Sequence, residues 1–168
     1  MKIFLIGFMG CGKSTLGKKL ATKLGFDFID LDQVLEDQMA SSIGEYFAAH
    51  GEDAFRALES KVLKEHNYPS DCVVATGGGA PCYFDNMEWM NNNGTTLYIE
   101  MPPIALAKRL EKGKEKRPLL RDMNEEQLIS FIESKLAERA RFYKSAALSI
   151  DGINLTPDKV LAELPQIF

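Results

Sequence analysis

The stretch IFLIGFMGCGKST, residues 3–15, decides the fold of this 168-residue chain. Its apolar run, Ile3–Ile6, leads directly into residues 7–14, which match the pattern G-x-x-x-x-G-K-[S/T]. The next segment, Ser14–Leu24, carries leucines on one face and predicts a helix. A buried strand, a glycine-rich loop and a helix in this order are typical of a loop that binds phosphate groups.

Each residue type in this loop suits a bound nucleoside triphosphate. Glycines allow successive backbone N–H groups to point toward one anion, and the helix N-terminus adds its partial positive charge. Lys13 is expected to reach the terminal phosphates, and the Ser14 hydroxyl to bind Mg²⁺. We interpret Cys11 as a small spacer and not as a nucleophile. The loop therefore predicts ATP or GTP with Mg²⁺, held by Gly10, Cys11, Gly12, Lys13, Ser14 and Thr15, but it does not identify the acceptor.

The composition limits the classes of function. Hydrophobic residues make up 45% and charged residues 26% of the chain, as in an ordinary globular protein. The formal net charge of −4 argues against nucleic acid or an anionic membrane as a partner. No apolar run approaches the roughly 20 residues of a membrane span, and the N-terminus has no signal-peptide pattern. The three cysteines, an odd number without metal-type spacing, predict a reducing cytoplasm.

Strand and helix patterns alternate along the chain. We expect strands at Ile3–Ile6, Phe26–Leu31, Cys72–Ala75, Thr95–Glu100 and Leu148–Ile150. We expect helices at Ser14–Leu24, from about Gln33, and at Ile43–His50, Glu52–His66, Phe84–Met90, Pro103–Glu111, Glu125–Tyr143 and Pro157–Leu164. This alternation predicts a single α/β domain, residues 1–168, whose mainly parallel sheet is covered by helices on both faces.

Asp30 and Asp32 come at the end of the second expected strand, on the edge where open α/β sheets bind ligands. If the strand continues, both carboxylates point the same way, and one can serve the Mg²⁺ shell while the other orients an attacking hydroxyl. Asp32 can equally be the N-cap of the following helix. The local sequence does not decide between these two interpretations.

Two further stretches have more than one interpretation. Gly77-Gly78-Gly79 follows the third strand and indicates either a tight turn or a close approach of the backbone to a ligand. The segment EKGKEKRPLLRD, residues 111–122, is polar, basic and aperiodic, which indicates either a mobile loop or a solvated run of charges.

Taken together, the motifs resemble the shikimate kinase family. The resemblance rests on the phosphate loop, Asp30-x-Asp32, Phe55-Arg56-x-x-Glu59, Gly77-Gly78-Gly79, Arg117-Pro118-Leu119 and Glu138-Arg139-x-x-x-Tyr143, and it spans essentially the whole chain. It implies a three-layer α/β/α P-loop fold with a five-stranded parallel sheet of order 2-3-1-4-5. It also implies a monomer with a mobile lid at about residues 111–123 and a shikimate-binding region at about residues 32–62.

The resemblance also implies a role for each matching residue. Arg56 and Arg139 match the arginines that bind the shikimate carboxylate, Asp32 the aspartate that binds its hydroxyls, and Asp30 the aspartate tied to the Mg²⁺ shell. The remaining acceptor-side positions are Gly78, Gly79, Met9, Phe47, Phe55 and Glu59. Lys13 and Arg117 would stabilise charge on the transferring phosphoryl group, while Arg109, Asn154 and Pro157 would hold the adenine end. Taken singly, Arg56–Glu59 could be a solvated helix pair, and the two phenylalanines could be plain core.

The expected activity is transfer of the ATP γ-phosphate to the 3-hydroxyl of shikimate, giving shikimate 3-phosphate and ADP for chorismate and aromatic amino acid biosynthesis. Two alternatives are a P-loop kinase of another small hydroxy acid, such as gluconate, and a non-catalytic nucleotide-binding module. Two positions depart from the family pattern. Arg141 stands where the family often has proline, and Asn154 stands where its adenine loop often has arginine or lysine.

Overall fold

The computed structural model describes residues 1–114, 117 and 119–164. Its centre is one five-stranded sheet of order β2-β3-β1-β4-β5 in which every paired neighbour is parallel. The strands are β1 (Lys2–Ile6), β2 (Asp27–Asp30), β3 (Cys72–Ala75), β4 (Thr95–Glu100) and β5 (Leu148–Asp151). The expected strand number, direction and order are therefore confirmed.

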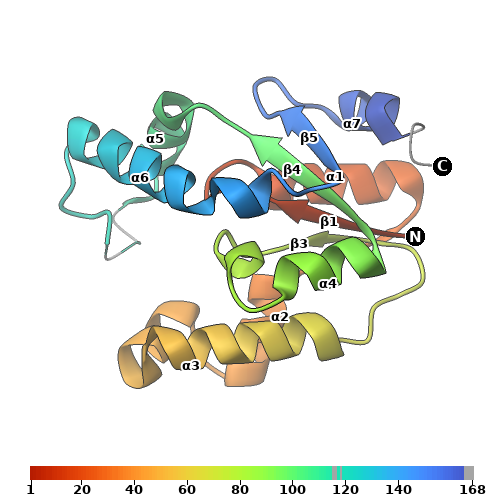
Figure 1. Ribbon diagram of the computed structural model, residues 1–168, viewed down its shortest axis with the longest axis horizontal. Coiled ribbons are helices and arrows are strands. Elements are labelled where there is room, and N and C mark those ends of the chain that lie inside the picture. Colours follow the sequence, from red (N-terminus) through yellow and green to blue (C-terminus); the bar gives the residue numbers. More distant parts are fainter. Residues whose placement is uncertain (115–116, 118, 165–168) are drawn as a thin grey trace.

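Helices cover both faces of this sheet and complete a three-layer fold (Figure 1). They are α1 (Lys13–Leu24), α2 (Leu31–Met39), α3 (Ile43–Glu65), α4 (Asn86–Asn93), α5 (Pro103–Glu111), α6 (Glu125–Tyr143) and α7 (Pro157–Glu163), with a short 3₁₀ helix η1 (Ala80–Cys82). Side chains of α1 and α7 pack on one face, and those of α3, α4 and the end of α6 pack on the other. None of the described helices combines the length and hydropathy that a membrane span requires.

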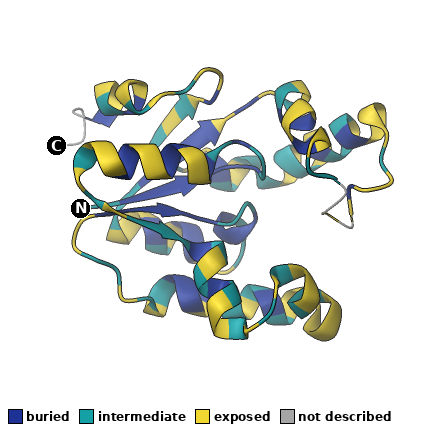
Figure 2. Ribbon diagram, turned by 180° about the vertical axis from the view of Figure 1, so that it is seen from behind, coloured by how far each residue is buried: buried dark blue, intermediate teal, exposed yellow. Residues whose placement is uncertain are grey.

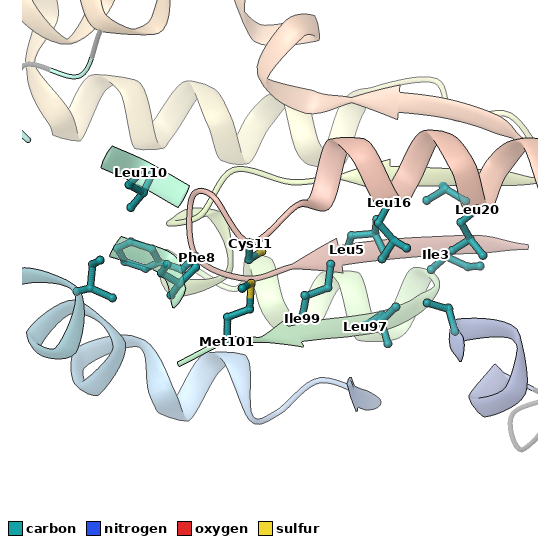
Figure 3. Packing of buried hydrophobic residues seen from close by; sticks show 14 of the residues in the cluster. Ile3, Leu5, Phe8, Cys11, Leu16, Leu20, Leu97, Ile99, Met101 and Leu110 are labelled. Atoms are coloured by element: carbon teal, nitrogen blue, oxygen red, sulfur yellow. The ribbon is translucent and has the colours of Figure 1, made fainter. Parts of the chain in front are cut away.

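The core follows from the two-residue repeat of the strands. Ile3 and Leu5 of β1 belong to the cluster under α1, whereas Phe4 and Ile6 belong to the cluster under α4. Figure 3 shows Leu16 and Leu20 of α1 lying beside Ile3 and Leu5. Because both faces are covered, the central strands are buried along their length (Figure 2). This packing fixes the carboxyl ends of the strands, where the loops with the functional motifs begin.

Most element boundaries agree with the expected ones, but the region after β2 differs. The helix α2 begins at Leu31, two positions before the expected start, so the strand ends at Asp30. The two helices expected at residues 43–50 and 52–66 form one element, α3, that is kinked where Gly51 adopts a left-handed φ of 84°. Glycine takes this conformation without steric cost, which explains the position of the kink. The helix α4 begins two residues later than expected, at Asn86.

Candidate active site

The phosphate loop lies between β1 and α1, as its motif predicts. Gly12 is the N-cap of α1 with a left-handed φ of 97°, so the first backbone N–H groups of the helix face the loop. The Lys13 side chain is only 9% exposed. Its Nζ donates hydrogen bonds to the carbonyl oxygens of Gly7, at 2.6 Å, and Phe8, at 3.1 Å. The ammonium group of Lys13 is thus hydrogen-bonded to the backbone of the phosphate loop itself.

Cys11 packs into the core beneath this loop. Its side chain is 3% exposed and lies close to Ile99 and Met101 (Figure 3). A Cβ atom at Gly7 would come within 2.8 Å of the Cys11 sulfur, so the loop has no room for a larger pair at these positions. A buried thiol of this kind fits the spacer role and not that of a nucleophile.

The two aspartates occupy different elements. The Asp30 side chain accepts a hydrogen bond from the backbone N–H of Asp32 at 3.0 Å and caps α2, whereas Asp32 lies in the first turn of that helix. The expectations of a strand that continues through Asp32, and of Asp32 as the cap, are therefore wrong. The helix starts early because Asp30 satisfies its free N–H group. Asp30 also accepts a hydrogen bond from the Ser14 hydroxyl at 3.2 Å.

Asp32 has an unusual electrostatic environment. Its burial raises the pKa of the carboxyl group, and the neighbouring charge of Asp30 raises it further. Lys13 and Arg56 act in the opposite direction. The result is a carboxyl group that binds a proton more readily than a solvated aspartate does.

A pocket of about 260 Å³ joins the loop to these carboxylates. It is lined by Met9, Gly10, Gly12, Lys13, Ser14, Thr15, Asp30, Asp32, Ala75, Thr76, Gly78 and Arg117. The described residues contain no cluster of three His, Cys, Asp or Glu side chains that would form a protein-only metal cage. One hydroxyl and one carboxylate, Ser14 and Asp30, instead fit Mg²⁺, which usually keeps several waters and binds substrate phosphates.

A second pocket, of about 300 Å³, adjoins the first and shares Gly12 and Thr15 with it. It is lined by Cys11, Gly12, Thr15, Leu16, Lys19, Arg109, Gly152, Leu155 and Pro157. Arg109 donates a hydrogen bond to the Gly10 carbonyl oxygen at 3.4 Å, which ties α5 to the loop. Asn154 does not line this pocket, and its own carbonyl oxygen accepts a hydrogen bond from Lys159 at 2.8 Å. Lys19 and Gly152 were not predicted, although a glycine directly after the last strand was a usable signal.

Arg56 is held from several sides on α3. Its Nη1 donates to Glu59 at 3.0 Å, and its Nε lies 3.5 Å from Glu52. The guanidinium carbon also lies 4.4 Å from the centre of the Tyr83 ring. Phe55 and Phe47 contribute further aromatic contacts at 5.3 and 5.9 Å. Since the Glu59 side chain is only 4% exposed, a solvated surface pair is the wrong interpretation of this motif.

The triple glycine makes room for the charged side chains around it. A Cβ at Gly79 would lie 2.7 Å from both terminal nitrogens of Arg56, and one at Gly77 would lie 2.9 Å from Glu59. A Cβ at Gly78 would lie 3.2 Å from the Met9 backbone nitrogen and 3.4 Å from Nη1 of Arg139. None of the three glycines has positive φ. They are therefore required for close approach and not for a left-handed turn.

Arg139 reaches the same loop from α6. Its Nη1 donates to the Tyr143 hydroxyl at 3.3 Å, and its guanidinium lies 5.4 Å from the Phe8 ring of the phosphate loop. The Tyr143 hydroxyl in turn donates to the Gly78 carbonyl oxygen. Tyr83 and Tyr143 were not expected in the site, although Tyr143 is the last residue of a quoted motif.

A larger cavity, of about 530 Å³, lies at the ends of β4 and β5 beside α6. It shares no residue with the phosphate loop or with the carboxylate and arginine groups described above. The smaller pocket is lined by the phosphate loop, both aspartates and Gly78, against which Arg139 lies, so it is the candidate active site.

A parallel sheet with a phosphate loop, two carboxylates and two converging arginines defines a P-loop kinase of a small molecule. A family model described as shikimate kinase matches residues 9–167. The chain belongs to the shikimate kinase family, as its motifs predict.

Individual relatives agree with this assignment. A shikimate kinase of Bacteroides fragilis is 47% identical over 146 residues, which cover 87% of this chain and 82% of the relative. The crystal structure of shikimate kinase from Bacteroides thetaiotaomicron superposes with a TM-score of 0.91 at 39% identity, covering 99% of this chain and 97% of that one. The shikimate kinase from Acinetobacter baumannii, in complex with shikimate, gives a TM-score of 0.86 at 32% identity over 98% and 93% of the two chains.

Proposed function

We propose that this protein transfers the γ-phosphate of ATP to the 3-hydroxyl of shikimate and releases shikimate 3-phosphate and ADP. The observation that carries this proposal is the pair of guanidinium groups beside the triple glycine. Arg139 lies against Gly78, and Arg56 lies against Gly79, the next residue of the chain. Two arginine forks with an aspartate nearby suit an acceptor that has both a carboxylate and hydroxyl groups.

The acceptor side of the reaction is assigned to Asp32 and the two arginines. Arg56 and Arg139 bind the shikimate carboxylate and orient the ring, while Asp32 accepts a hydrogen bond from the 3-hydroxyl. As the hydroxyl oxygen bonds to the γ-phosphorus, its proton passes to Asp32. The bond between the γ-phosphorus and the bridging oxygen breaks at the same time, and its electron pair leaves with ADP. The backbone of Gly78 and Gly79 and the side chains of Met9, Phe47, Phe55 and Glu59 shape this pocket.

The donor side is assigned to the phosphate loop and its neighbours. Lys13 exchanges the carbonyl oxygens of Gly7 and Phe8 for phosphate oxygens when ATP binds. Ser14 and Asp30 would hold Mg²⁺, which, when bound, neutralises charge on the β- and γ-phosphates. Arg109 and Pro157 line the pocket assigned to the nucleoside, with Asn154 in the adjoining loop.

Residues 111–123 are assigned as the lid of a single kinase domain, and residues 32–62 as its shikimate-binding region. Arg117 supports the lid role because its Nη1 lies 3.4 Å from the Met9 sulfur, at the wall between donor and acceptor. From there it would neutralise charge on the transferring phosphoryl group. A closed lid also excludes water, which competes with shikimate as an acceptor. Residues 115, 116 and 118 of the assigned lid lie outside the described residues.

The proposal extends to the setting of the enzyme. We expect a monomer that works in the cytoplasm, with shikimate and ATP as its ligands. All three cysteines are free in the fold, which is consistent with a reducing compartment. Light scattering after size-exclusion chromatography tests the monomer directly.

The decisive experiment is a coupled ADP-release assay with shikimate, gluconate, nucleoside monophosphates and no acceptor. We expect rapid ADP release when shikimate is the acceptor and not with any of the other acceptors. Turnover on gluconate but not on shikimate would favour the other hydroxy-acid kinase. No acceptor-dependent turnover with any compound would favour a nucleotide-binding module.

Asp32→Asn tests the assigned chemistry within the same assay. Loss of the proton acceptor should reduce kcat by about 10²- to 10⁴-fold. The fold should remain intact, because the substitution removes a buried charge next to Asp30 and keeps the side-chain shape. An unchanged kcat would mean that a group other than Asp32 accepts the proton.

A further inference from the structure

Tyr143 is a buried residue that the proposed reaction does not use. It is the last residue of α6 and has 0% of its surface exposed. Its ring stacks on Tyr98 of β4 with 5.0 Å between centroids and an interplanar angle of 28°. The stack fixes the ring, so the position of the hydroxyl group is set by packing and not by side-chain rotation.

The hydroxyl lies between two groups of the acceptor site. Arg139 Nη1 donates to it at 3.3 Å, and the hydroxyl donates to the Gly78 carbonyl oxygen. The direction of these two bonds is fixed, because a guanidinium group can only donate and a carbonyl oxygen can only accept. Burial raises the pKa of the Tyr143 hydroxyl, so it keeps its proton and remains a donor at any working pH. A chain of two hydrogen bonds thus runs from Arg139 through Tyr143 to the glycine loop.

Arg139 needs such a contact to be held in place. No ion pair of Arg139 is found within residues 1–114, 117 and 119–164, and its guanidinium group otherwise lies over the Phe8 ring, 5.4 Å from the ring centre. A free arginine side chain loses rotamer entropy when it binds a ligand, which weakens binding. A neutral hydroxyl restrains the guanidinium without cancelling its charge. Gly78, at the other end of these two hydrogen bonds, packs against the Met9 backbone nitrogen. The restraint therefore also fixes the position of Arg139 relative to the phosphate loop.

We propose that Tyr143 is a positioning residue for acceptor binding, whose hydroxyl holds Arg139 against the glycine loop in the orientation that meets the substrate carboxylate. This inference rests on the proposed function, since it needs an anionic acceptor at Arg139. It predicts that Tyr143 affects the binding of the acceptor and leaves ATP binding and the chemical step nearly unchanged.

Tyr143→Phe removes only the hydroxyl and keeps the ring in its stack. We expect the KM for shikimate to rise about 10-fold, as for loss of one charge-assisted hydrogen bond, with kcat and the KM for ATP within about 2-fold. Tyr98→Phe is the matched control, because it removes the hydroxyl from the other ring of the same stack and that hydroxyl is not part of the chain to Arg139. The control should leave all three constants within about 2-fold.

A double-mutant cycle separates positioning from a general structural role. In an Arg139→Ala background, Tyr143→Phe should change the KM for shikimate by less than about 2-fold, since the group it positions is gone. A full 10-fold effect in that background would overturn the inference, as would a Tyr143→Phe enzyme with unchanged KM. Wild-type protein that does not phosphorylate shikimate would instead refute the proposed function, so the two failures are distinct.

Discussion

The two arginines of the acceptor site have contrasting surroundings. Arg56 is 12% exposed, pairs with the buried Glu59 and the exposed Glu52, and stacks on Tyr83. Arg139 touches a tyrosine hydroxyl and an aromatic ring, and none of its contacts in the described part of the chain is with a carboxylate. Arg56 is therefore ion-paired within the fold, while Arg139 has no ion pair among the described residues and acts on Glu59 only at longer range, by lowering the pKa of that carboxyl group.

This difference separates two kinds of contribution to one site. A compensated arginine adds geometry and directed N–H groups, whereas an uncompensated one adds net attraction for a carboxylate. The compensated pair is also interdependent. Burial raises the pKa of Glu59, and Arg56 partly offsets this effect, so Glu59 would be a costly charge without its partner. Substitution of Arg56 should accordingly lower stability as well as acceptor binding, whereas substitution of Arg139 should lower acceptor binding with little effect on stability.

The largest effect is expected for Arg56→Ala. It leaves Glu59, 4% exposed, without its main partner, and should lower the free energy of unfolding by about 3 kcal/mol. Urea denaturation followed by circular dichroism measures this loss. Arg56→Ala combined with Glu59→Gln should recover part of it, because the unpaired charge is removed. A loss below about 1 kcal/mol in the single variant would mean that the pair is not compensated as described.

Arg139→Ala should show a large change in acceptor binding and only a small change in stability. The KM for shikimate should rise about 100-fold through loss of a charged fork, with the KM for ATP unchanged. The free energy of unfolding should change by less than about 1 kcal/mol, because the buried Glu59 keeps its ion pair with Arg56. Arg141→Ala is the control on the same helix, since Arg141 is exposed and stacks on its neighbour Phe142. Wild-type kinetics for Arg139→Ala would mean that the acceptor pocket is misplaced.

A smaller effect is expected for Gly79→Ala, which tests how firmly Arg56 is held. The new methyl group would lie 2.7 Å from the guanidinium nitrogens, and should cost about 1–2 kcal/mol through displacement of that group. Backbone strain does not contribute, because φ at Gly79 is −91°. Gly44→Ala, a position in α3 with nothing within 4 Å, is the control and should not destabilise the protein. Equal melting temperatures for both variants would show that Arg56 moves freely.

The smallest effect is expected for Tyr83→Phe and depends on pH. The Tyr83 hydroxyl donates to Glu52 at 2.8 Å, and this bond lowers the pKa of that carboxyl group below its ordinary value of 4.5. A lowered carboxyl pKa stabilises the fold above the unfolded-state value, and the benefit is lost as pH falls through the folded-state value.

Thermal scans from pH 3 to pH 7 should therefore place Tyr83→Phe about 1 °C below the wild type near pH 7, with the difference shrinking below about pH 4.5. A difference that grows at acidic pH would contradict the assigned bond.

Local patterns were sufficient for most of the fold. The hydrophobic period located all five strands, and the bounds of α5 and α6 match the expected ranges because proline and a clear apolar stripe mark them. The start of α2 was misplaced because a side-chain cap, the bond from Asp32 to Asp30, decided it. Helix boundaries of this kind depend on the geometry of one side chain, which periodicity does not record.

The residues of the candidate site likewise divide into those that local patterns located and those that they did not. The phosphate loop, the aspartates and the arginines could be located because glycine, carboxylate and guanidinium groups recur in ordered motifs. Tyr83 could not, because a tyrosine in a loop has no local mark that separates it from core, and Tyr143 was located as part of a motif but without a role. Asn154, placed at the adenine end by the same motifs, lies outside the pocket that Arg109 and Pro157 line.

The sequence by itself determined the class of fold, the phosphate loop and the chemical types of the side chains that serve it. These properties depend on residues that are neighbours along the chain, within the range of helix and strand periods. Only the tertiary structure decided that Arg56 is ion-paired with Glu59 while Arg139 meets a tyrosine hydroxyl, and that Tyr143 joins α6 to Gly78 across 65 positions of sequence. Such contacts arise when distant segments pack on one sheet, and no local pattern specifies them.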